Sequence, residues 1–339
     1  MSKILICDPT LRDGNHAVAH QITSDQIALY AAAADCAGVP VVEVGHGNGL
    51  GASSLQVGLA KVPDAEMLRV AKEHLVHSKL GIHVIPGFAT VRGHLMQALD
   101  LGVDVVRVAS HCTEADTTEQ HISYVRSTGK EVYGVLMMSH MASPNVLLDE
   151  ALKMQSYGAE AVVIMDSAGA YVPDDVSERI GILTDGLGVP VGFHGHNNLG
   201  MAVANSVAAV RAGAAIIDGT ARGFGAGAGN TQLEVLIPVL HKLGFETGID
   251  LYAILDAADT AEKHLMPNPP IVSSTSIVSG LAGVFSGFSK HVLRLSAEYG
   301  VDPRDVFFEL GRRKVVAGQE DSVIEVVIML AGKGTKTCH

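Results

Sequence analysis

The 339-residue sequence has few of the features that mark several classes of protein. Its four cysteines lie far apart with no CxxC pair, and its N-terminus, MSKILICD, lacks the charged-then-apolar pattern of a signal peptide. Together these two absences predict a reduced, cytoplasmic protein. Basic residues are also few, with 24 Lys and Arg against 36 Asp and Glu, and they are scattered. This distribution argues against nucleic-acid and anionic-membrane partners.

Long apolar runs are missing as well, although 47% of the residues are hydrophobic. No run of 18 apolar residues occurs, and the longest uncharged stretch, 265–289, is interrupted by three prolines and several serines. A membrane span needs about 20 consecutive apolar residues. The sequence therefore excludes a transmembrane helix.

What the chain does contain is a series of short runs rich in Val and Ile, each followed by a helical pattern. The runs are nearly continuous in apolar residues, as expected for parallel strands that are covered on both faces. Eight such units within about 240 residues predict an α/β fold, specifically a (β/α)₈ TIM barrel. The eight runs are ILIC (4–7), VVEV (41–44), GIHVI (81–85), VDVVRVA (103–109), EVYGVLM (131–137), AVVIM (161–165), PVGFH (190–194) and AAIIDG (214–219).

A doubly wound open sheet is the competing fold, and it would gather the functional groups at one switch point. Candidate functional residues are instead spread around all eight runs, as Asp13 is after the first, Pro86 and Gly87 after the third and Asp166 after the sixth. Such a spread over the carboxyl strand ends favours the barrel.

The pattern changes after Gly244, where one more helix precedes the chain-breaking PNPP and the rest reads as helices without strands. We therefore predict a catalytic barrel over 1–262 and a small all-helical domain over 263–339.

The HGHNN motif supplies the first candidate chemistry. On an extended strand His194 and His196 point the same way, about 6.6 Å apart along the chain, so both can reach one ion. The histidine pair alone fits a structural role equally well. A third ligand is needed to decide between a structural pair and a metal site. The first strand end offers DPTLRDGNH, with Asp8 and Asp13 as carboxylates. Two imidazoles and one carboxylate suit a divalent ion, such as Mn, Co, Zn or Fe, that acts as a Lewis acid on a carbonyl.

Two neighbours in the same segment complete this reading. Arg12 is placed to hold a developing enolate oxygen, and His16 to act as a general base. The alternative is that Arg12 and Asp13 form only a salt bridge in the first loop. Schiff-base chemistry is disfavoured, because no lysine follows a predicted strand.

Three motifs, TLRDGNH, HGHNNLG and GFGAGAGN, resemble those of the metal-dependent pyruvate aldolases in the barrel superfamily of hydroxymethylglutaryl-CoA lyase. The resemblance covers nearly the whole chain. The segments VGHGNGLGASS, SHCTEAD, MDSAGAY and the tail ELGRRKVVAGQED are similar to the 4-hydroxy-2-oxovalerate aldolases in particular. This family cleaves 4-hydroxy-2-oxoacids to pyruvate and a short aldehyde, through a pyruvate enolate held at the metal, in the catabolism of aromatic or related compounds.

The resemblance also implies roles for individual residues. Asp13, His194 and His196 would bind the metal, usually Mn²⁺, with Co²⁺ or another divalent ion as alternatives. Arg12 would neutralise the enolate oxygen, and His16 would take the proton of the C4 hydroxyl. Ser167 would donate a hydrogen bond to the substrate carboxylate.

Two further positions carry open questions. Asn230, at the end of GFGAGAGN, would be a metal ligand or a neighbour of the ligands. At Phe285 the relatives usually carry a tyrosine, which bears on the C4 stereochemistry and on the aldehyde accepted. The alternative for Phe285 is that it packs inside the helical domain, away from substrate.

The runner-up function is an acyl-CoA lyase or condensing enzyme of the same superfamily. It would need a catalytic cysteine in the loop after the eighth strand, and GFGAGAGN has none. A barrel that only binds another protein would be expected to have lost Arg12, Asp13 or His16. The resemblance further implies an acylating acetaldehyde dehydrogenase as partner, which would dock on 271–289 and the helical tail.

Overall fold

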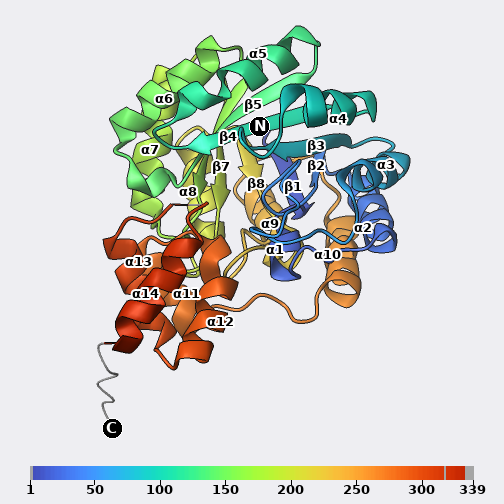
Figure 1. Ribbon diagram of the computed structural model, residues 1–339. Coiled ribbons are helices and arrows are strands. Elements are labelled where there is room, and N and C mark those ends of the chain that lie inside the picture. The colour runs from blue at the N-terminus through green and yellow to red at the C-terminus, as the bar shows by residue number, and fades with distance from the viewer. Residues whose placement is uncertain (1–2, 317, 333–339) are drawn as a thin grey trace.

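The computed structural model describes residues 3–316 and 318–332 as a closed barrel of eight parallel strands with a group of helices at its carboxyl end (Figure 1). Each strand pairs with the next along the chain, and β8 pairs with β1. All eight predicted runs are strands, so the predicted barrel is confirmed. The strands are β1 Leu5–Leu11, β2 Val41–Val44, β3 Lys79–Val84, β4 Val105–His111, β5 Glu131–Met137, β6 Ala161–Asp166, β7 Val191–Gly195 and β8 Ile216–Asp218.

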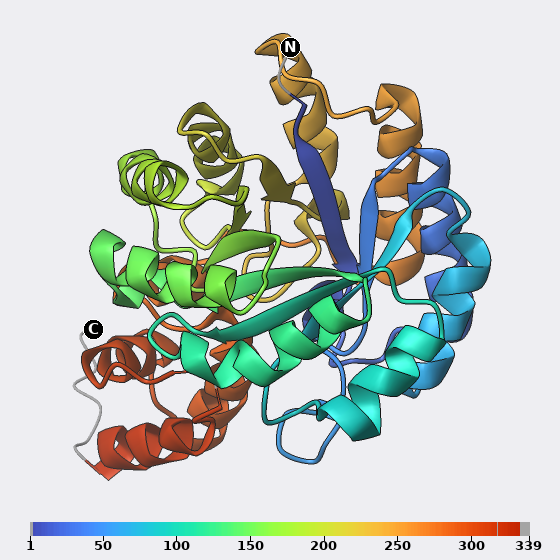
Figure 2. The same ribbon diagram turned by 90° about the horizontal axis from the view of Figure 1, so that it is seen from above.

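Helices surround the barrel on its outside (Figure 2). Thr23 shows how the sequence starts one of them, because its hydroxyl accepts a hydrogen bond from the amide of Gln26 while the Gln26 side chain accepts one from the amide of Thr23. The outer helices are α2 Ser24–Cys36, α3 Asp64–His74, α4 Met96–Asp100, α5 Glu119–Ser127, α6 Pro144–Ser156, α7 Pro173–Gly186, α8 Ala202–Arg211, α9 Leu233–Lys242 and α10 Leu251–Leu265. The short helix α1, Gly14–Ala17, follows the carboxyl end of β1.

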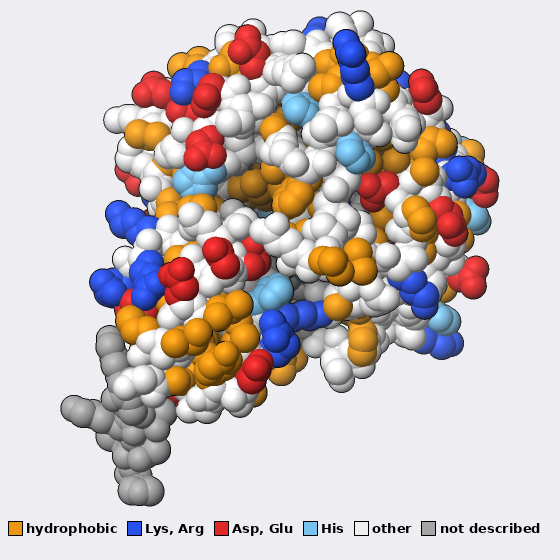
Figure 3. All heavy atoms as spheres, in the orientation of Figure 1, with side chains coloured by type: hydrophobic (Ala, Val, Ile, Leu, Met, Phe, Trp, Pro, Cys, Tyr) orange, Lys and Arg blue, Asp and Glu red, His pale blue; other side chains and the backbone are white. Residues whose placement is uncertain are grey.

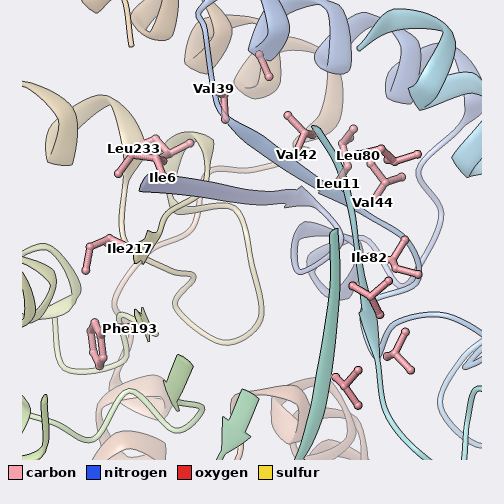
Figure 4. Close-up of a cluster of buried hydrophobic side chains, with 14 of the residues drawn as sticks. Ile6, Leu11, Val39, Val42, Val44, Leu80, Ile82, Phe193, Ile217 and Leu233 are labelled. Atoms are coloured by element: carbon pink, nitrogen blue, oxygen red, sulfur yellow. The ribbon is translucent and has the colours of Figure 1, made fainter. Parts of the chain in front are cut away.

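The main hydrophobic core lies between the strands and these helices. Ile6, Val42, Ile82, Phe193 and Ile217, from five different strands, are buried in it together (Figure 4). Their neighbours along each strand point into the barrel instead. Burial on both faces explains why the strand sequences are continuous apolar runs.

The barrel interior has apolar layers at two levels. The lower layer includes Val105 and the upper layer includes Ala109, both on β4. Charged side chains lie between these levels, namely Glu43 on β2, Arg107 on β4 and Asp218 on β8, and each is at most 1% exposed. Barrel interiors are usually filled by bulky apolar side chains, so this charged level is unusual.

Four helices follow the barrel and have a hydrophobic cluster of their own, which includes Phe288, Phe307 and Val326. The predicted boundary at residue 263 falls in the last turn of α10, and Leu265 is buried in the barrel core. The division into two domains stays a prediction, and its last residues, 333–339, lie outside the described part of the chain. These helices are α11 Ser274–Ala282, α12 Ser289–Tyr299, α13 Pro303–Arg312 and α14 Asp321–Gly332.

Within the described residues, no helix is both long enough and apolar enough to cross a membrane.

Candidate active site

Asp13, His194 and His196 come together at the carboxyl end of the barrel, with one ligand atom of each within 4.8 Å of the others. The Nε2 atoms of His194 and His196 lie 3.3 and 3.7 Å from Oδ2 of Asp13. Ligands at about 2.1 Å from one ion are separated by about 3.0 to 4.2 Å, so these spacings fit a shared divalent cation. All three side chains are buried.

Asp8, the other carboxylate of the DPTLRDGNH segment, is hydrogen-bonded to residues outside the metal cluster. Its carboxylate accepts hydrogen bonds from the hydroxyl of Tyr30, at 2.6 Å, and from the amide of Thr10, at 2.9 Å. The structure thus separates the two carboxylates that the sequence left as alternatives, and only Asp13 joins the histidine pair.

The charges of the cluster are set by burial and by its neighbours. Burial raises the pKa of the Asp13 carboxyl, but the Arg12 guanidinium and the histidine rings outweigh burial and hold that pKa well below its usual range. Burial lowers the pKa of His196 to about 4. Asp13 is therefore anionic and His196 neutral near pH 7, which are the states that bind cations.

His194 is oriented from behind by a second carboxylate. Its Nδ1 lies 2.9 Å from Oδ2 of Asp218, at the end of β8, which leaves Nε2 facing Asp13. Burial lowers the pKa of His194, but the bonds to Asp13 and Asp218 prevail and raise it. A carboxylate on the far nitrogen is a common feature of metal-binding histidines, because it fixes the tautomer.

Two nitrogen atoms of the Arg12 guanidinium donate hydrogen bonds to carboxylates, and the third has no partner in the part of the chain that the structure describes. Its Nε donates to Glu43 at 2.6 Å, and its Nη1 donates to Asp13 at 3.0 Å. Its Nη2 is buried and has no hydrogen-bond partner among the described residues. Arg12 and Asp13 do form a salt bridge, but that bridge is part of a larger network, and one donor remains available to an anion.

A cavity of about 170 Å³ opens beside these groups. A wider cavity of about 600 Å³ lies between the barrel and the C-terminal helices, and His16 and Phe285 line both cavities. The smaller cavity has both polar and apolar lining residues. Its polar lining is Arg12, Asp13, His16, Asn48, His83, Ser167, His196 and Glu320, and its apolar lining includes Ile85, Phe88, Met137, Met165 and Phe285.

His16 lies in the short helix α1, where its ring packs against Gly47. A Cβ at position 47 would be 2.6 Å from His16 Cδ2, so a larger residue there would push the ring. His20 packs edge-on against the same ring, with centroids 5.2 Å apart, and stacks on His46 at 3.6 Å. Burial lowers the pKa of His16 to about 4, so the imidazole is neutral at pH 7 and able to accept a proton.

Ser167, which follows β6, and Phe285, which lies between α11 and α12, both line the cavity. The Ser167 hydroxyl accepts a hydrogen bond of 3.0 Å from the amide of Met138, which leaves its own hydrogen free to donate. Phe285 precedes a short 3₁₀ turn in the C-terminal region and packs edge-on against Phe288. Phe285 thus contacts the helical cluster and also lines the cavity.

Asn230 lies directly against the metal cluster. Its Nδ2 is 2.9 Å from Nε2 of His194 and 3.3 Å from Oδ2 of Asp13, and its Oδ1 is buried without a partner among the described residues. Exchanging the two ends of the amide, which have nearly the same shape, would turn the oxygen toward the cluster.

Several residues of the site were not assigned to it from the sequence, and one of them, His83, was interpreted as an ordinary core or loop histidine. Glu43 and Asp218 orient Arg12 and His194, and His83 lines the cavity. Glu43 and Asp218 could have been recognised in the sequence, because each is the only charged residue in a run rich in apolar residues. The apolar lining residues carried none, since a cavity residue and a core residue look alike in sequence.

Comparisons with known proteins show the family of the chain. Residues 3–261 match the HMGL-like family, and residues 270–332 match the DmpG-like communication domain. The chain is 66% identical to the 4-hydroxy-2-oxovalerate aldolase of Pectobacterium atrosepticum, over 97% of this chain and 96% of the relative. It is 64% identical to the enzyme of the same name from Spirochaeta aurantia, over 98% of each chain.

The fold also occurs in a more distant protein. The carboxyl transferase domain of pyruvate carboxylase from Rhizobium etli superposes with a TM-score of 0.81 at 16% identity. The match covers 98% of this chain and 61% of that one, and at this identity it bears on the fold alone.

Proposed function

Because this chain belongs to the HMGL-like family and, within it, to the 4-hydroxy-2-oxovalerate aldolases, we propose that it cleaves 4-hydroxy-2-oxoacids to pyruvate and a short aldehyde by a metal-dependent retro-aldol reaction. One observation carries the proposal more than any other. The free Nη2 of Arg12 lies buried beside an anionic carboxylate and two histidines that fit one cation. Such a pairing of a cation site with an unused guanidinium donor suits an oxyanion that forms during reaction.

Asp13, His194 and His196 would hold the metal, with Asn230 as a neighbour or a further ligand. The mixed oxygen and nitrogen ligands suit Mn²⁺, and Co²⁺ or another divalent ion would also fit. When bound, the ion would supply Lewis-acid polarisation of the substrate carbonyl.

The chain's own residues would supply the rest of the chemistry. Neutral His16 takes the proton from the C4 hydroxyl, the C3–C4 bond breaks, and its electron pair moves into the C2–C3 bond while the C2 oxygen becomes an enolate oxygen. Arg12 donates to that oxygen through Nη2, and Ser167 donates its hydroxyl hydrogen to the C1 carboxylate. The aldehyde leaves, a proton from water adds to C3 to give pyruvate, and His16 returns the C4 hydroxyl proton to solvent.

The shape of the cavity supports a small substrate. Its apolar lining, which Phe88 and Phe285 help to form, suits the alkyl end of a short aldehyde. The acyl-CoA alternative has less support, because no cysteine is among the described residues that line either cavity.

The direct test is to incubate the purified chain with 4-hydroxy-2-oxopentanoate and to measure pyruvate and acetaldehyde. We expect both products in equal amounts with Mn²⁺, none after chelation, and recovery when Mn²⁺ or Co²⁺ is returned. Full turnover in excess chelator, or a pyruvate adduct trapped by borohydride, would refute the metal mechanism.

We further propose an acylating acetaldehyde dehydrogenase as the partner, which would oxidise the released aldehyde with NAD and coenzyme A. The communication-domain match over 270–332 supports this partner. Figure 3 shows a patch of hydrophobic side chains over the C-terminal helices. The exposed apolar residues of these helices include Ile277, Leu281, Leu293, Ile324 and Ile328. Cytoplasmic catabolism of aromatic or related compounds is the setting that we propose for this pair.

A further inference from the structure

Arg107 is a guanidinium enclosed in the middle of the barrel. It lies on β4, two residues after Val105 in the lower apolar layer and two before Ala109 in the upper one, and it is 0% exposed. Removing an ion from water costs free energy, and apolar side chains of similar size often stabilise a core at least as well. Stability alone is therefore a poor explanation for an arginine at this position.

Its two ends bind two carboxylates that serve different parts of the site. Nη1 lies 3.1 Å from Oε2 of Glu43, and Nη2 lies 2.6 Å from Oδ2 of Asp218. The other oxygen of Glu43 accepts the hydrogen bond from Nε of Arg12. Asp218 accepts the hydrogen bond from Nδ1 of His194.

These contacts close into a ring, because Asp13 also joins Arg12 at 3.0 Å and faces His194 at 3.3 Å. The ring holds three carboxylates and two guanidiniums, so with a neutral histidine it carries one negative charge in excess. In order, its members are Asp13, Arg12, Glu43, Arg107, Asp218 and His194.

We propose that Arg107 is a positioning residue that couples the metal-binding half of the site to the enolate-binding half. It holds Asp218 where that carboxylate fixes the His194 tautomer, and it holds Glu43 where that carboxylate fixes the Arg12 side chain. A planar fork with two separate donors can span both carboxylates, whereas the single ammonium of lysine cannot do so with the same geometry. This role rests on the proposed function, since it concerns the same metal and the same enolate.

Two measurements on Arg107→Lys test the coupling. The first is the Mn²⁺ dissociation constant from calorimetry, which needs no turnover. The second is exchange of the pyruvate methyl protons at saturating Mn²⁺, which reports on Arg12. We expect the affinity for Mn²⁺ to fall by on the order of 10- to 100-fold, as for other partners behind metal ligands, and the exchange rate to fall as well.

Arg222→Gln is the matched control. Arg222 pairs with Glu234, Asp259 and Glu262 outside the barrel, away from the cavity. Its loss should lower the unfolding temperature and leave both readouts unchanged. Native values for Arg107→Lys in both measurements would overturn the proposal.

A double-mutant comparison distinguishes an effect of Arg107 on the metal site through Asp218 from a general loss of stability. If Arg107 acts on the metal through Asp218, then in an Asp218→Asn background the further change Arg107→Lys should leave the Mn²⁺ affinity nearly unchanged. A further tenfold loss would refute action through Asp218. This comparison can also be made if Arg107→Lys alone does not fold. In the double variant, the neutral amide of Asn at position 218 replaces the buried Asp218 carboxylate that would otherwise lack its arginine partner. Failure of the native chain to bind Mn²⁺ would instead count against the proposed function.

Discussion

The backbone amide of Ser286 donates a hydrogen bond of 2.9 Å to the carbonyl oxygen of Ser167 at the end of β6. Asn198 strengthens this link, because its amide group donates to the Ser286 hydroxyl at 2.9 Å and to the Ala168 carbonyl at 2.8 Å. The segment before α12 is thereby tied to the barrel mouth next to a proposed substrate-binding serine. Phe285 is held at the cavity as a result.

Phe285 should relax the stereochemistry of cleavage. An apolar ring offers no hydrogen bond to the C4 hydroxyl, so discrimination between the two C4 enantiomers should be weaker by about 1 to 2 kcal/mol than with a phenol there. We expect the native chain to turn over both enantiomers of a 4-hydroxy-2-oxoacid and to tolerate a longer aldehyde. Phe285→Tyr should restore a preference for one enantiomer.

The measurement is kcat/KM for each pure enantiomer with both proteins. Phe308→Tyr is a suitable control, because Phe308 is half exposed on α13 and lines neither cavity. Strict use of one enantiomer by both native chain and Phe285→Tyr would show that this position does not govern the choice.

Substitutions of His16 and Arg12 should have different effects on cleavage and on enolate formation. His16→Ala should lower the cleavage rate by on the order of 10² to 10⁴, since it removes the base, and should leave pyruvate methyl-proton exchange comparatively intact. Arg12→Ala should reduce both, because both reactions pass through the enolate. The two rates can be followed by product assay and by proton NMR in D₂O. An equal loss of exchange in the two variants would remove the assignment.

Metal binding should weaken as the pH falls. The bonds to Asp13 and Asp218 raise the pKa of His194 above its usual 6.5, so near pH 6.5 more than half of the metal-free protein carries a proton on this ring. Binding a cation must displace that proton, whereas His196, with a pKa near 4, has none to lose. Affinity should therefore drop by up to tenfold per pH unit below the raised pKa.

Calorimetry of Mn²⁺ binding at pH 6.5, in buffers that differ in ionisation enthalpy, counts the protons released. We expect between one half and one proton per ion. A dissociation constant that stays the same from pH 6 to pH 8 would contradict the protonated state of His194.

Gly225 should be intolerant of any side chain. A Cβ at this position would overlap Oδ1 of Asn230 and approach Oδ1 of Asp13 to 3.4 Å. Gly225→Ala should displace Asn230 and lower the Mn²⁺ affinity by about tenfold. Gly181→Ala, in α7, is the control, because a Cβ there meets open space and alanine favours a helix by about 1 kcal/mol. Equal Mn²⁺ affinities for the two variants would show that Asn230 does not support the metal site.

The exposed apolar side chains of the C-terminal helices should mediate docking of the dehydrogenase. Ile277→Ser with Leu281→Ser should abolish co-purification of the two proteins, because burial of such side chains drives association. Tyr252→Ser, which alters an exposed aromatic side chain on α10, should not. Retention of the dehydrogenase by the double variant would place the interface elsewhere.

Most of the fold could be predicted from the sequence, because parallel strands that are buried on both faces form mostly apolar runs, and polar residues follow most of these runs. The resemblance to the 4-hydroxy-2-oxovalerate aldolases is confirmed. The convergence of His194 and His196 with a carboxylate from the first strand end was expected from their positions at carboxyl strand ends. The resemblance implied that this carboxylate is Asp13. The roles assigned to His16, Arg12, Ser167 and Phe285 remain predictions.

The network behind the site was not foreseen. Glu43, Arg107 and Asp218 each occupy an inward position of a different strand, and only the registers of the closed barrel bring their charged ends within hydrogen-bond distance. A single sequence shows that each strand carries a charge, but it does not show which charges meet. The cavity lining depends in the same way on how loops fold over the barrel mouth.

The metal cluster takes one ligand from the first strand end and two from the seventh, and the carboxylate behind His194 comes from the eighth. During synthesis on the ribosome, the chain therefore has no assembled cluster until most of the barrel has emerged. The first strand must wait for the eighth to pair with it before the ring of strands closes. The complete set of ligands therefore exists only after the seventh strand has been made.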